Sequence, residues 1–365
     1  MRTIPALPPQ PRKPRMQDIA AKAQVSIGTV SRVLNGKPDV TADLAERVMR
    51  TAQAMGYGIR NGERQNSKRQ RNLGSIGYIV DSINETSIAT EPFQQHFIAG
   101  IEQTITERGG HLIFSTCRNE ILKDAVPAMV VENLVSGVIL KACNETSADW
   151  VQKISHLIPL VLLMHRDIWN PLPSVMCDNR GAVFQALRHL RDLGHTKVGF
   201  FYENDAPKVI SPHHEERLEA FLKYAPLLGM ELRPEYVQAP SRNVAKGEDV
   251  PEVAQAALKN FLALGKQRPT AILGAADVYA LSLIRQADKF GLKLPRDLSL
   301  IGIMNTDACE FSAPALTSVS LSEEEVGRAA VDLLEERIEQ PFASVREVIV
   351  GAHLVERGSC AKPPF

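Results

Sequence analysis

A run of small polar side chains surrounds one arginine between Ser26 and Asn35 of this 365-residue chain. A guanidinium such as that of Arg32 can bond the O6 and N7 atoms of guanine together, and each such pair contributes about 1 to 3 kcal/mol of discrimination between bases. Hydroxyl and amide groups beside it can bond bases or phosphates. The members of this group are Ser26, Ile27, Gly28, Thr29, Ser31, Arg32 and Asn35. Residues of these types can enter a DNA groove without steric blockage and still offer hydrogen-bond donors.

Two short helices joined by a tight turn would position this group. The first helix is expected from about Met16 to Ala23, with small and apolar residues on one face that let another helix approach closely. Ser26 is a typical N-cap, so a second helix begins at Ile27. Gly36 can adopt the left-handed conformation that ends this helix. The residues expected to face inward are Ile19, Ala20, Ala23, Val30, Val33 and Leu34.

A third helix is expected from about Thr41 to Met55, with Leu44, Val48 and Ala52 on its buried stripe. Three helices in this order are typical of a helix-turn-helix unit, which lays its second helix in the major groove while the first crosses the backbone. A small helical packing unit without a nucleic-acid partner is the alternative interpretation, and the charge distribution described below argues against it.

The sequence V-S-I-G-T-V-S-R-V-L-N-G, preceded by D-I-A and followed by M-G-Y, resembles the lac repressor family of bacterial regulators. It departs from the family at Gln24, where glycine is usual in the turn, so this turn is expected to be strained or differently shaped. The resemblance implies that bases are read by Ile27, Gly28 and Arg32. It also implies that phosphates or bases are contacted by Ser26, Thr29, Ser31 and Asn35.

Charge is distributed unevenly along a chain whose 42 basic and 42 acidic residues balance overall. Residues 1–72 carry 14 basic and 5 acidic residues, a net charge of +9, and the remainder therefore carries −9. Basic residues neutralise DNA phosphates, whereas an acidic body is repelled by the polyanion. The positive end coincides with the helix-turn-helix pattern, which supports a DNA partner.

Composition indicates the class of protein and how the chain divides into domains. The sequence is 44% hydrophobic, has no run near the roughly 20 apolar residues of a membrane span and no signal-peptide core at its proline-rich start, so we expect a cytoplasmic protein without a membrane partner. Five scattered cysteines without a C-x-x-C pair favour reduced thiols over disulfides or zinc. We divide the chain into a flexible basic arm (1–15), a helix-turn-helix domain (16–60), a hinge or linker (61–72) and an effector-binding and dimerisation domain (73–365).

The linker is polar and basic and has no apolar periodicity. In the family that it resembles, this place holds a hinge helix whose leucine enters the minor groove and kinks the DNA. Asn66 lies about where that leucine would fall. Either the hinge is organised differently, or the regulator bends DNA less and relies on Lys68, Arg69 and Arg71 for backbone contacts. We favour the second interpretation.

From Leu73 onward, short apolar runs alternate with helical segments. This spacing predicts right-handed βαβ units and parallel sheets covered on both faces. The fold class is therefore α/β, with a three-helix head and a two-lobed body similar to periplasmic sugar-binding proteins. The lobes are expected to comprise approximately 73–190 with 320–340, and 191–319 with 341–365.

Ligands of open parallel sheets bind beyond the carboxyl ends of the strands, so the loops there are the expected effector site. By resemblance, Phe93 matches an aromatic residue that stacks on the effector, Arg217 matches an arginine of the family, and Arg166 follows a strand as another family arginine does. Core packing is the alternative role for Phe93, and a surface salt bridge is the alternative for each arginine. The full expected set is Phe93, Gln94, Arg166, Arg217, Ala276, Asp277 and Met304.

Several of these positions depart from the family pattern. Gln94 replaces a second aromatic, Ala276 precedes Asp277 where many sugar-binding members have asparagine, and Met304 replaces an aspartate. Buried hydroxyls without partners cost about 1 to 3 kcal/mol each, so an ordinary hexose in the usual pose is disfavoured. We predict a ligand with an apolar face near Met304 and Ala276 and an anionic or hydroxylated end near the two arginines.

Three functional classes follow from these patterns. The leading class is a DNA-binding transcriptional regulator, a repressor, which works as a homodimer on operator DNA and responds to a small-molecule effector such as a sugar derivative. The second is a regulator that needs no effector. The third is a nucleotide-binding enzyme, which the absence of a phosphate-binding glycine motif and of a clustered nucleophile, base and acid disfavours.

The remaining interpretations concern partners. No cofactor or metal is expected, because adjacent His213 and His214 would point apart on a helix and no spaced third ligand is evident. One helix-turn-helix reads too few base pairs for genomic specificity, so a dimer is expected. The family resemblance implies that its surface includes the helix region from Phe97 to Ile101.

Overall fold

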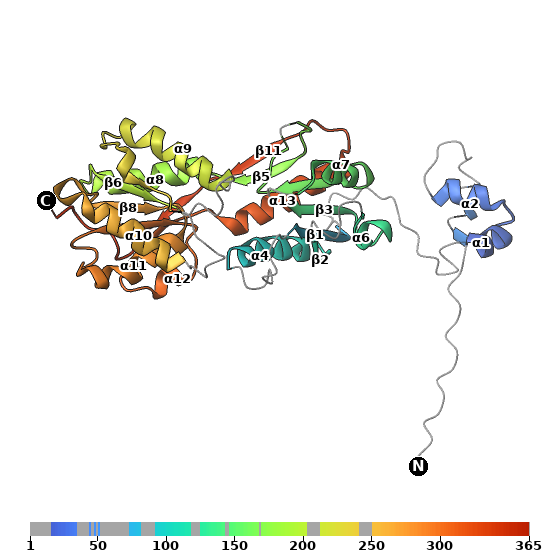
Figure 1. Ribbon diagram of the computed structural model, residues 1–365. Helices are drawn as coiled ribbons and strands as arrows, with labels where there is room; N and C mark the ends of the chain where they lie inside the picture. The colour runs from blue at the N-terminus through green and yellow to red at the C-terminus, as the bar shows by residue number, and fades with distance from the viewer. Residues whose placement is uncertain are drawn as a thin grey trace, which may run out of the picture. The chain divides into compact units, whose positions relative to one another are not determined.

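The structure is a computed structural model with two compact units, Met1–Arg69 and Gln70–Phe365 (Figure 1). It describes residues 16–34, 44, 47, 48, 50, 51, 73–81, 92–117, 125–142, 146–167, 169–202, 212–240 and 250–364. The arm, the whole of the expected linker with its basic residues Lys68, Arg69 and Arg71, and Asn35 lie outside these ranges. Among the described helices, none has the length and apolar character needed to cross a bilayer.

The first unit contains the two helices expected from the sequence. Helix α1 spans Met16–Ala23 and helix α2 spans Ile27–Leu34, which confirms the predicted range of α1 and the predicted start of α2, whereas the predicted end at Asn35 and Gly36 lies outside the described residues. Apolar residues from both helices form a small buried core with Val48, which lies with its described neighbours in a helical segment of the expected third helix. The core comprises Ile19, Ala20, Ala23, Val30 and Val48.

Three local features close the turn between α1 and α2. Gln24 has φ 55°, the left-handed region in which a residue with a Cβ is strained. The amide of Val25 donates to the carbonyl of Ala20 over 3.0 Å, and the amide of Thr29 donates to Ser26 Oγ over 3.0 Å. Ser26 therefore caps α2, as the sequence predicts.

The second unit contains two six-stranded sheets, each the centre of one lobe. The sheet of the first lobe has the order β11-β5-β4-β3-β1-β2, and every described pairing in it is parallel. Its strands are β1 (Ser75–Asp81), β2 (His111–Cys117), β3 (Gly137–Lys141), β4 (Leu160–Leu163), β5 (Ser174–Cys177) and β11 (Glu347–Val350).

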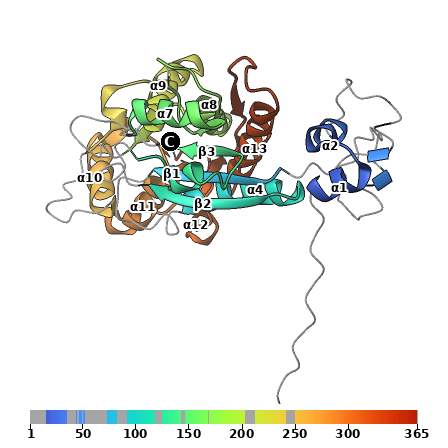
Figure 2. The same cartoon turned by 90° about the vertical axis from the view of Figure 1, so that its right-hand side faces the viewer.

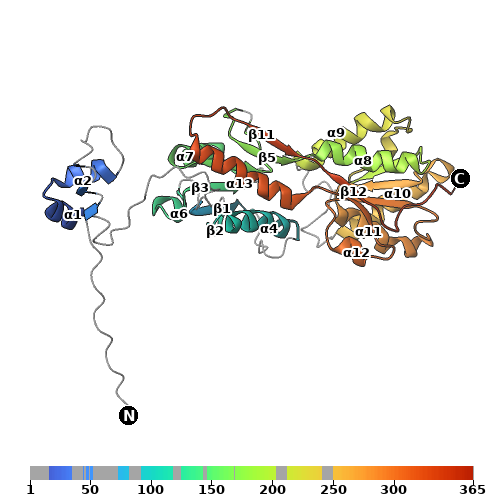
Figure 3. The same ribbon diagram turned by 180° about the vertical axis from the view of Figure 1, so that it is seen from behind.

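Helices cover both faces of this sheet because successive residues of its strands point to opposite sides. Ile139 of β3 faces the core shared with α4 (Pro92–Glu107) and α13 (Glu323–Glu339), whereas its neighbours Val138 and Leu140 pack in a separate cluster with α6 (Ala128–Val131) and α7 (Ala148–Leu157). Helix α13 lies alongside α4 (Figure 3).

The sheet of the second lobe has the order β12-β10-β9-β8-β6-β7, with only the β10–β12 pair antiparallel. Helices α8 and α9 lie on one side of it, and α10 and α11 lie on the other (Figure 2). Its strands are β6 (Val198–Phe201), β7 (Val237–Gln238), β8 (Ala271–Gly274), β9 (Ser299–Ile303), β10 (Thr317–Ser320) and β12 (His353–Val355). Its helices are α8 (Asn179–Asp192), α9 (Pro212–Leu227), α10 (Val250–Ala263), α11 (Asp277–Ala287) and α12 (Ala308–Phe311), with the 3-10 turns η2 (Pro234–Tyr236), η4 (Gly265–Gln267) and η5 (Asp288–Phe290).

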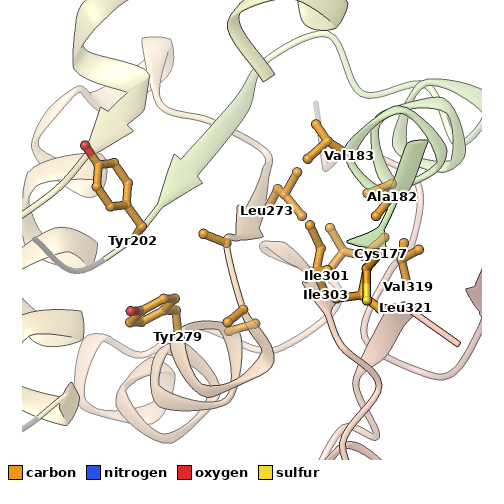
Figure 4. Close-up of a cluster of buried hydrophobic side chains, with 14 of the residues drawn as sticks. Cys177, Ala182, Val183, Tyr202, Leu273, Tyr279, Ile301, Ile303, Val319 and Leu321 are labelled. Carbon is orange, nitrogen blue, oxygen red and sulfur yellow. The ribbon is translucent and has the colours of Figure 1, made fainter. Parts of the chain in front are cut away.

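The chain passes between the lobes three times, from β5 to α8, from β10 to α13 and from β11 to β12. Hydrogen bonds join these crossings: the amide of Asp178 donates to Val350 over 3.0 Å, and Ser322 Oγ donates to the carbonyl of Gly351 over 2.9 Å. One apolar core runs through the junction, where Cys177 lies beside Leu321 (Figure 4). The lobes are thus coupled by both backbone bonds and packing.

The observed lobes differ in two places from those expected. Helix α8 was assigned to the first lobe but packs on α9 and on strands of the second, and β11 was assigned to the second lobe but pairs with β5 of the first. Both differences arise because the crossings lie at residues 178 and 351–352, which local periodicity does not mark. In the helix region expected to belong to the dimer surface, Phe97 and Ile101 are fully buried in the core of the lobe, whereas Ala99 is exposed, and the dimer surface stays a prediction.

Close packing of α4 on α13 depends on two glycines. A Cβ at Gly100 would overlap the backbone carbonyl of Glu324, and one at Gly327 would lie 2.5 Å from the carbonyl oxygen of Phe97. Backbone atoms at such a contact cannot rotate away as a flexible side chain can. Both positions therefore require glycine despite its low helix propensity.

We predict that Gly100→Ala lowers the free energy of unfolding of residues 73–365 by about 2 kcal/mol or more, because the helices must separate. Chemical denaturation followed by circular dichroism measures this. Gly351→Ala is the matched control, since nothing lies within 4 Å of a Cβ there. Equal stability of the two variants would contradict the packing argument.

Candidate DNA-reading and effector sites

One side of α2 is turned away from the core of the first unit. Val30 is fully buried, whereas Ile27 is 47% exposed and Gly28 and Arg32 are exposed. The hydroxyls of Ser26 and Thr29 lie 2.8 Å apart, which fixes both at the start of the helix. An arginine, two hydroxyls and a small residue therefore share one accessible surface, the DNA-reading surface. The side chain of Ser31 is outside the described residues, as is Asn35.

In the second unit, Arg217 on α9 lies entirely within the protein at 2% exposure. Its Nε donates to Asn179 Oδ1 over 2.8 Å, and Nη1 donates to the carbonyl of Ala275 over 2.6 Å. Burial lowers the pKa of this guanidinium, against the attraction of Asp277 and Glu323. A guanidinium has five N–H donors, so these two bonds leave further donors for another acceptor.

Asp277 is the second buried charge, at 1% exposure on the first turn of α11. Its carboxylate accepts from Ser318 Oγ over 2.5 Å and from the amide of Thr306 over 2.7 Å. Burial raises the pKa of Asp277, and these two bonds oppose that shift. A Cβ at Gly302 would overlap Oδ1 of Asp277, so the carboxylate is seated directly on strand β9.

The expected effector residues of the second lobe therefore lie together. Ala275, which accepts from Arg217, precedes Ala276, and Ala276 precedes Asp277 at the start of α11. Met304 follows β9, with φ 116°, and its amide donates to Val319 over 2.8 Å. The carboxyl ends of strands β8 and β9 thus meet the start of α11, which is where open α/β sheets hold ligands.

An aromatic wall stands beside this group. The ring of His214 lies 5.5 Å from that of Tyr279 and 6.5 Å from that of Tyr202, and Tyr202 and Tyr279 lie on the same side of Leu273 (Figure 4). Burial lowers the pKa of His213 and of His214 to about 3, so both rings are neutral near pH 7. Among the described residues, no group bonds to His213 Nδ1, although this atom is buried. The wall can therefore offer neutral polar and aromatic contacts.

On the first lobe, the expected residues are placed differently. Gln94 is buried at 1% exposure, and its Oε1 accepts from the hydroxyl of Tyr78 over 3.3 Å. Phe93 belongs to the first turn of α4, and its side chain is outside the described residues. Arg166 follows β4, but its guanidinium is held by two carboxylates.

Arg166 joins the two lobes by ion pairs. Its Nε and Nη2 donate to Glu347 of β11 over 2.6 and 2.8 Å, and its Nη1 donates to Glu216 of α9 over 3.1 Å. Glu216 also accepts from Asn179 Nδ2 over 2.8 Å, and Asn179 accepts from Arg217. A continuous chain of bonds thus links the two expected arginines through residues that the sequence did not single out.

The sequence gives only partial indications that Asn179 and Glu216 belong to this site. Glu216 directly precedes Arg217, but nothing in that adjacency indicates a bond to Arg166, and Asn179 is 38 positions from Arg217. Asp178 is recognisable as an N-cap, because its Oδ1 accepts from the amide of Gly181 over 2.7 Å. A search for polar residues at the cap of the helix that follows a strand would therefore have included Asn179.

The fold and these sites define a class: a helix-turn-helix head followed by a two-lobed α/β body with buried polar residues between its sheets. Residues 15–59 match the family model for bacterial regulatory proteins of the lacI family, and residues 187–360 match that for a periplasmic binding protein-like domain.

Known proteins extend this match along the whole chain. This chain is 32% identical over 361 residues to the HTH-type transcriptional regulator MalR of Streptomyces coelicolor, and the alignment covers 96% of this chain and 97% of that protein. It is 29% identical over 351 residues, with the same coverage, to the HTH-type transcriptional repressor CytR of Escherichia coli K12. The chain belongs to the lacI family of bacterial regulatory proteins, and it is a DNA-binding transcriptional regulator.

Solved structures agree. The transcriptional regulator CelR in complex with cellobiose superposes with a TM-score of 0.64 at 25% identity, covering 95% of this chain and 99% of that one. A regulator of the same family from Enterococcus faecium with bound ribose gives a TM-score of 0.61 at 22% identity, covering 79% of this chain and 99% of that one. The second likeness shows the fold alone.

A third buried group that can carry charge, Glu323, lies near Arg217 and Asp277 at the start of α13. Burial raises its pKa to about 7 from an ordinary value of 4.5, although His96 and Arg217 act in the opposite direction. A carboxyl whose pKa is raised on folding stabilises the fold fully below the unfolded value, and this stabilisation is lost as pH rises through the folded value.

We therefore predict that unfolding free energy falls between pH 4.5 and pH 8 by about 3 kcal/mol through this group alone, and that Glu323→Gln removes that part of the pH dependence. Urea titrations at a series of pH values measure it. Glu339→Gln, an exposed position at the other end of α13, is the control. Parallel pH profiles for wild type and Glu323→Gln would refute the prediction.

Proposed function

We propose that this regulator is a homodimeric repressor whose heads bind a pseudo-palindromic operator and whose operator affinity changes when a small molecule binds between the lobes. The observation that carries the proposal is the buried pair Arg217 and Asp277 at the carboxyl edge of a parallel sheet, in a chain that also has an exposed reading surface on α2. Burying two charged groups is costly unless their bonds are used, and a bound ligand uses them.

Operator reading falls to the exposed residues of α2. We assign base contacts to Ile27, Gly28 and Arg32, and phosphate or base contacts to the polar residues around them. The proposed DNA-binding set is Ser26, Ile27, Gly28, Thr29, Ser31, Arg32, Asn35, Lys68, Arg69 and Arg71. Two heads are needed because one reads too few base pairs, and a two-fold dimer fits a two-fold operator.

The effector pocket that we propose has a polar end and an apolar face. Arg217 and Asp277 supply the polar end, and Ala276, Met304 and the aromatic wall supply the apolar face. We also assign effector contacts to Phe93 and Gln94 of the first lobe, and Arg166 contributes through Glu216. A small hydroxylated molecule with a flat or apolar side fits this chemistry. Support comes from a similar regulator, since CelR is solved in complex with cellobiose.

We predict that Arg32→Ala reduces the preference for operator over unrelated DNA by about 10- to 100-fold per head, since a bidentate base contact is lost. Binding assays on both DNAs at several salt concentrations measure this ratio. Lys22→Ala, an exposed basic residue on α1, is the matched control and should weaken both DNAs alike and lower the salt dependence. Unchanged selectivity in Arg32→Ala would overturn the assignment.

We predict that an effector found by screening metabolites for release or strengthening of the operator complex loses at least 10-fold in affinity in Arg217→Ala and nearly as much in Arg217→Lys, because a lysine lacks the guanidinium fork. Calorimetry measures the affinity. Arg180→Ala is the control, since that arginine is exposed and pairs with Glu219.

Two results would contradict this part of the proposal. Binding of a plain neutral hexose at micromolar affinity, undiminished in Arg217→Ala, would show that the ligand does not use the buried arginine. A complete metabolite panel without effect on operator binding would favour the effector-independent regulator.

A further inference from the structure

A separate cavity of about 300 Å³ lies at the junction of the lobes. Its lining comes from both lobes: His96 of α4 and the first turn of α13 on one side, and Asn305, Ser320 and His353 on the other. None of the expected effector residues lines it. Since a water molecule occupies about 30 Å³ in the liquid, the space is large enough for a small organic molecule. The lining residues are His96, Asn305, Ser320, Ser322, Glu323, Glu324, Glu325 and His353.

One wall of the cavity is a buried acid without a partner side chain. Glu323 is only 5% exposed and lines the space, and apart from its own backbone N–H no described group donates a hydrogen bond to it. The favourable field at a helix N-terminus explains the exposed Glu324 and Glu325 of the same turn. It does not explain the burial of Glu323, because an unpaired carboxyl in a protein interior is costly.

His353 and Ser320 supply further polar groups around the space. Ser322 Oγ donates its single proton to the carbonyl of Gly351 over 2.9 Å, so its contact of 3.2 Å with His353 Nδ1 requires that this nitrogen carry the donated proton. In the neutral ring, Nε2 of His353 is then an acceptor. Ser320 Oγ accepts from the amide of Ser322 over 3.2 Å and keeps its own proton.

Charges near the cavity favour a cation. Three glutamates line it, and His96 lies 3.7 Å from Glu324 and 3.9 Å from Asp307. Two arginines interact with lining residues without lining the cavity themselves. Arg357 donates to Asn305 Oδ1 over 2.8 Å, and Arg217 interacts with Glu323 at longer range. No lysine or arginine is among the lining residues.

A bare metal ion does not fit this lining. Within the described ranges, no three histidine, cysteine, aspartate or glutamate side chains come together closely enough to hold one. An organic ammonium is different, because its three N–H donors can reach a carboxyl and hydroxyls that are several ångströms apart.

We propose that this cavity binds a small organic cation carrying a primary ammonium group, which pairs with Glu323. The lining of this cavity includes none of the residues that we assign to the effector, although Glu323 also interacts with Arg217 and Asp277 at longer range. Because both lobes line the cavity, the bound cation contacts both. Pairing with a cation favours the ionised form of Glu323, so binding releases a proton near neutral pH and strengthens as pH rises. The titratable and charged groups around Glu323 are His96, His353, Glu324, Glu325, Asp307, Asp277, Arg217, Arg357 and Cys177.

The test is calorimetric titration of the full chain with 1,4-diaminobutane, with 1,4-butanediol as the uncharged probe of the same length and Mg²⁺ as the metal probe. We expect saturable binding of the diamine alone. Repeating the titration near pH 7 in buffers of different ionisation enthalpy counts the protons released. We expect Glu323→Gln to lower diamine affinity at least 10-fold and to abolish proton release, while Glu339→Gln leaves both unchanged.

A double variant tests the proposal without changing the buried residue Glu323. Glu324→Gln with Glu325→Gln changes only exposed residues, and the loss of two charges at the mouth should weaken diamine binding about 3- to 10-fold. No diamine binding between pH 6 and pH 9, equal binding by Glu323→Gln, equal binding of butanediol, or binding of Mg²⁺ in place of the diamine would each overturn the proposal.

Discussion

The body of this regulator is organised around two charged side chains that it buries, Arg217 and Asp277. An ionised group can be taken out of water only if its hydrogen-bonding capacity is met inside the protein. That requirement fixes Asn179 at the start of α8, the carbonyl of Ala275 after β8, and Ser318 on β10, because each supplies a bond. Elements far apart in sequence are thereby held at one edge of the second sheet, with the aromatic wall beside them.

The first lobe is attached to this edge through the crossings. The crossing from β11 to β12 accepts a hydrogen bond from each of the other two, at Val350 from Asp178 and at Gly351 from Ser322. Helix α13 begins at one crossing and packs closely on α4 through Gly100 and Gly327. The start of α13 therefore moves with the first lobe while Ser320, only a few residues earlier, belongs to the second sheet. A group placed in the cavity between them contacts both bodies.

Local signals in the sequence predict helices and strands, but they do not predict which lobe each one belongs to. Ser26 and the apolar spacing predict the range of α1 and the start of α2 as observed, because capping and helix periodicity depend on neighbouring residues. The lobe of β11 depends on pairing with β5, about 170 residues away, and periodicity carries no information on pairing. Resemblance indicated Arg217 and Asp277, whereas the bonds of Asn179 and Glu216 follow only from the folded arrangement.

The chain of bonds from Glu347 through Arg166, Glu216 and Asn179 to Arg217 joins the lobes by polar contacts outside the crossings. Exposed ion pairs such as that of Arg166 contribute only about 1 kcal/mol or less, so this chain does not fix one lobe arrangement rigidly. In the function proposed above, a ligand acceptor that displaces Asn179 Oδ1 from Arg217 also removes the bond that holds Asn179 in place to donate to Glu216. Ligand binding at Arg217 and the polar contact between the lobes then compete for the same side chains. Such competition is the condition for a ligand to shift the population of lobe conformations.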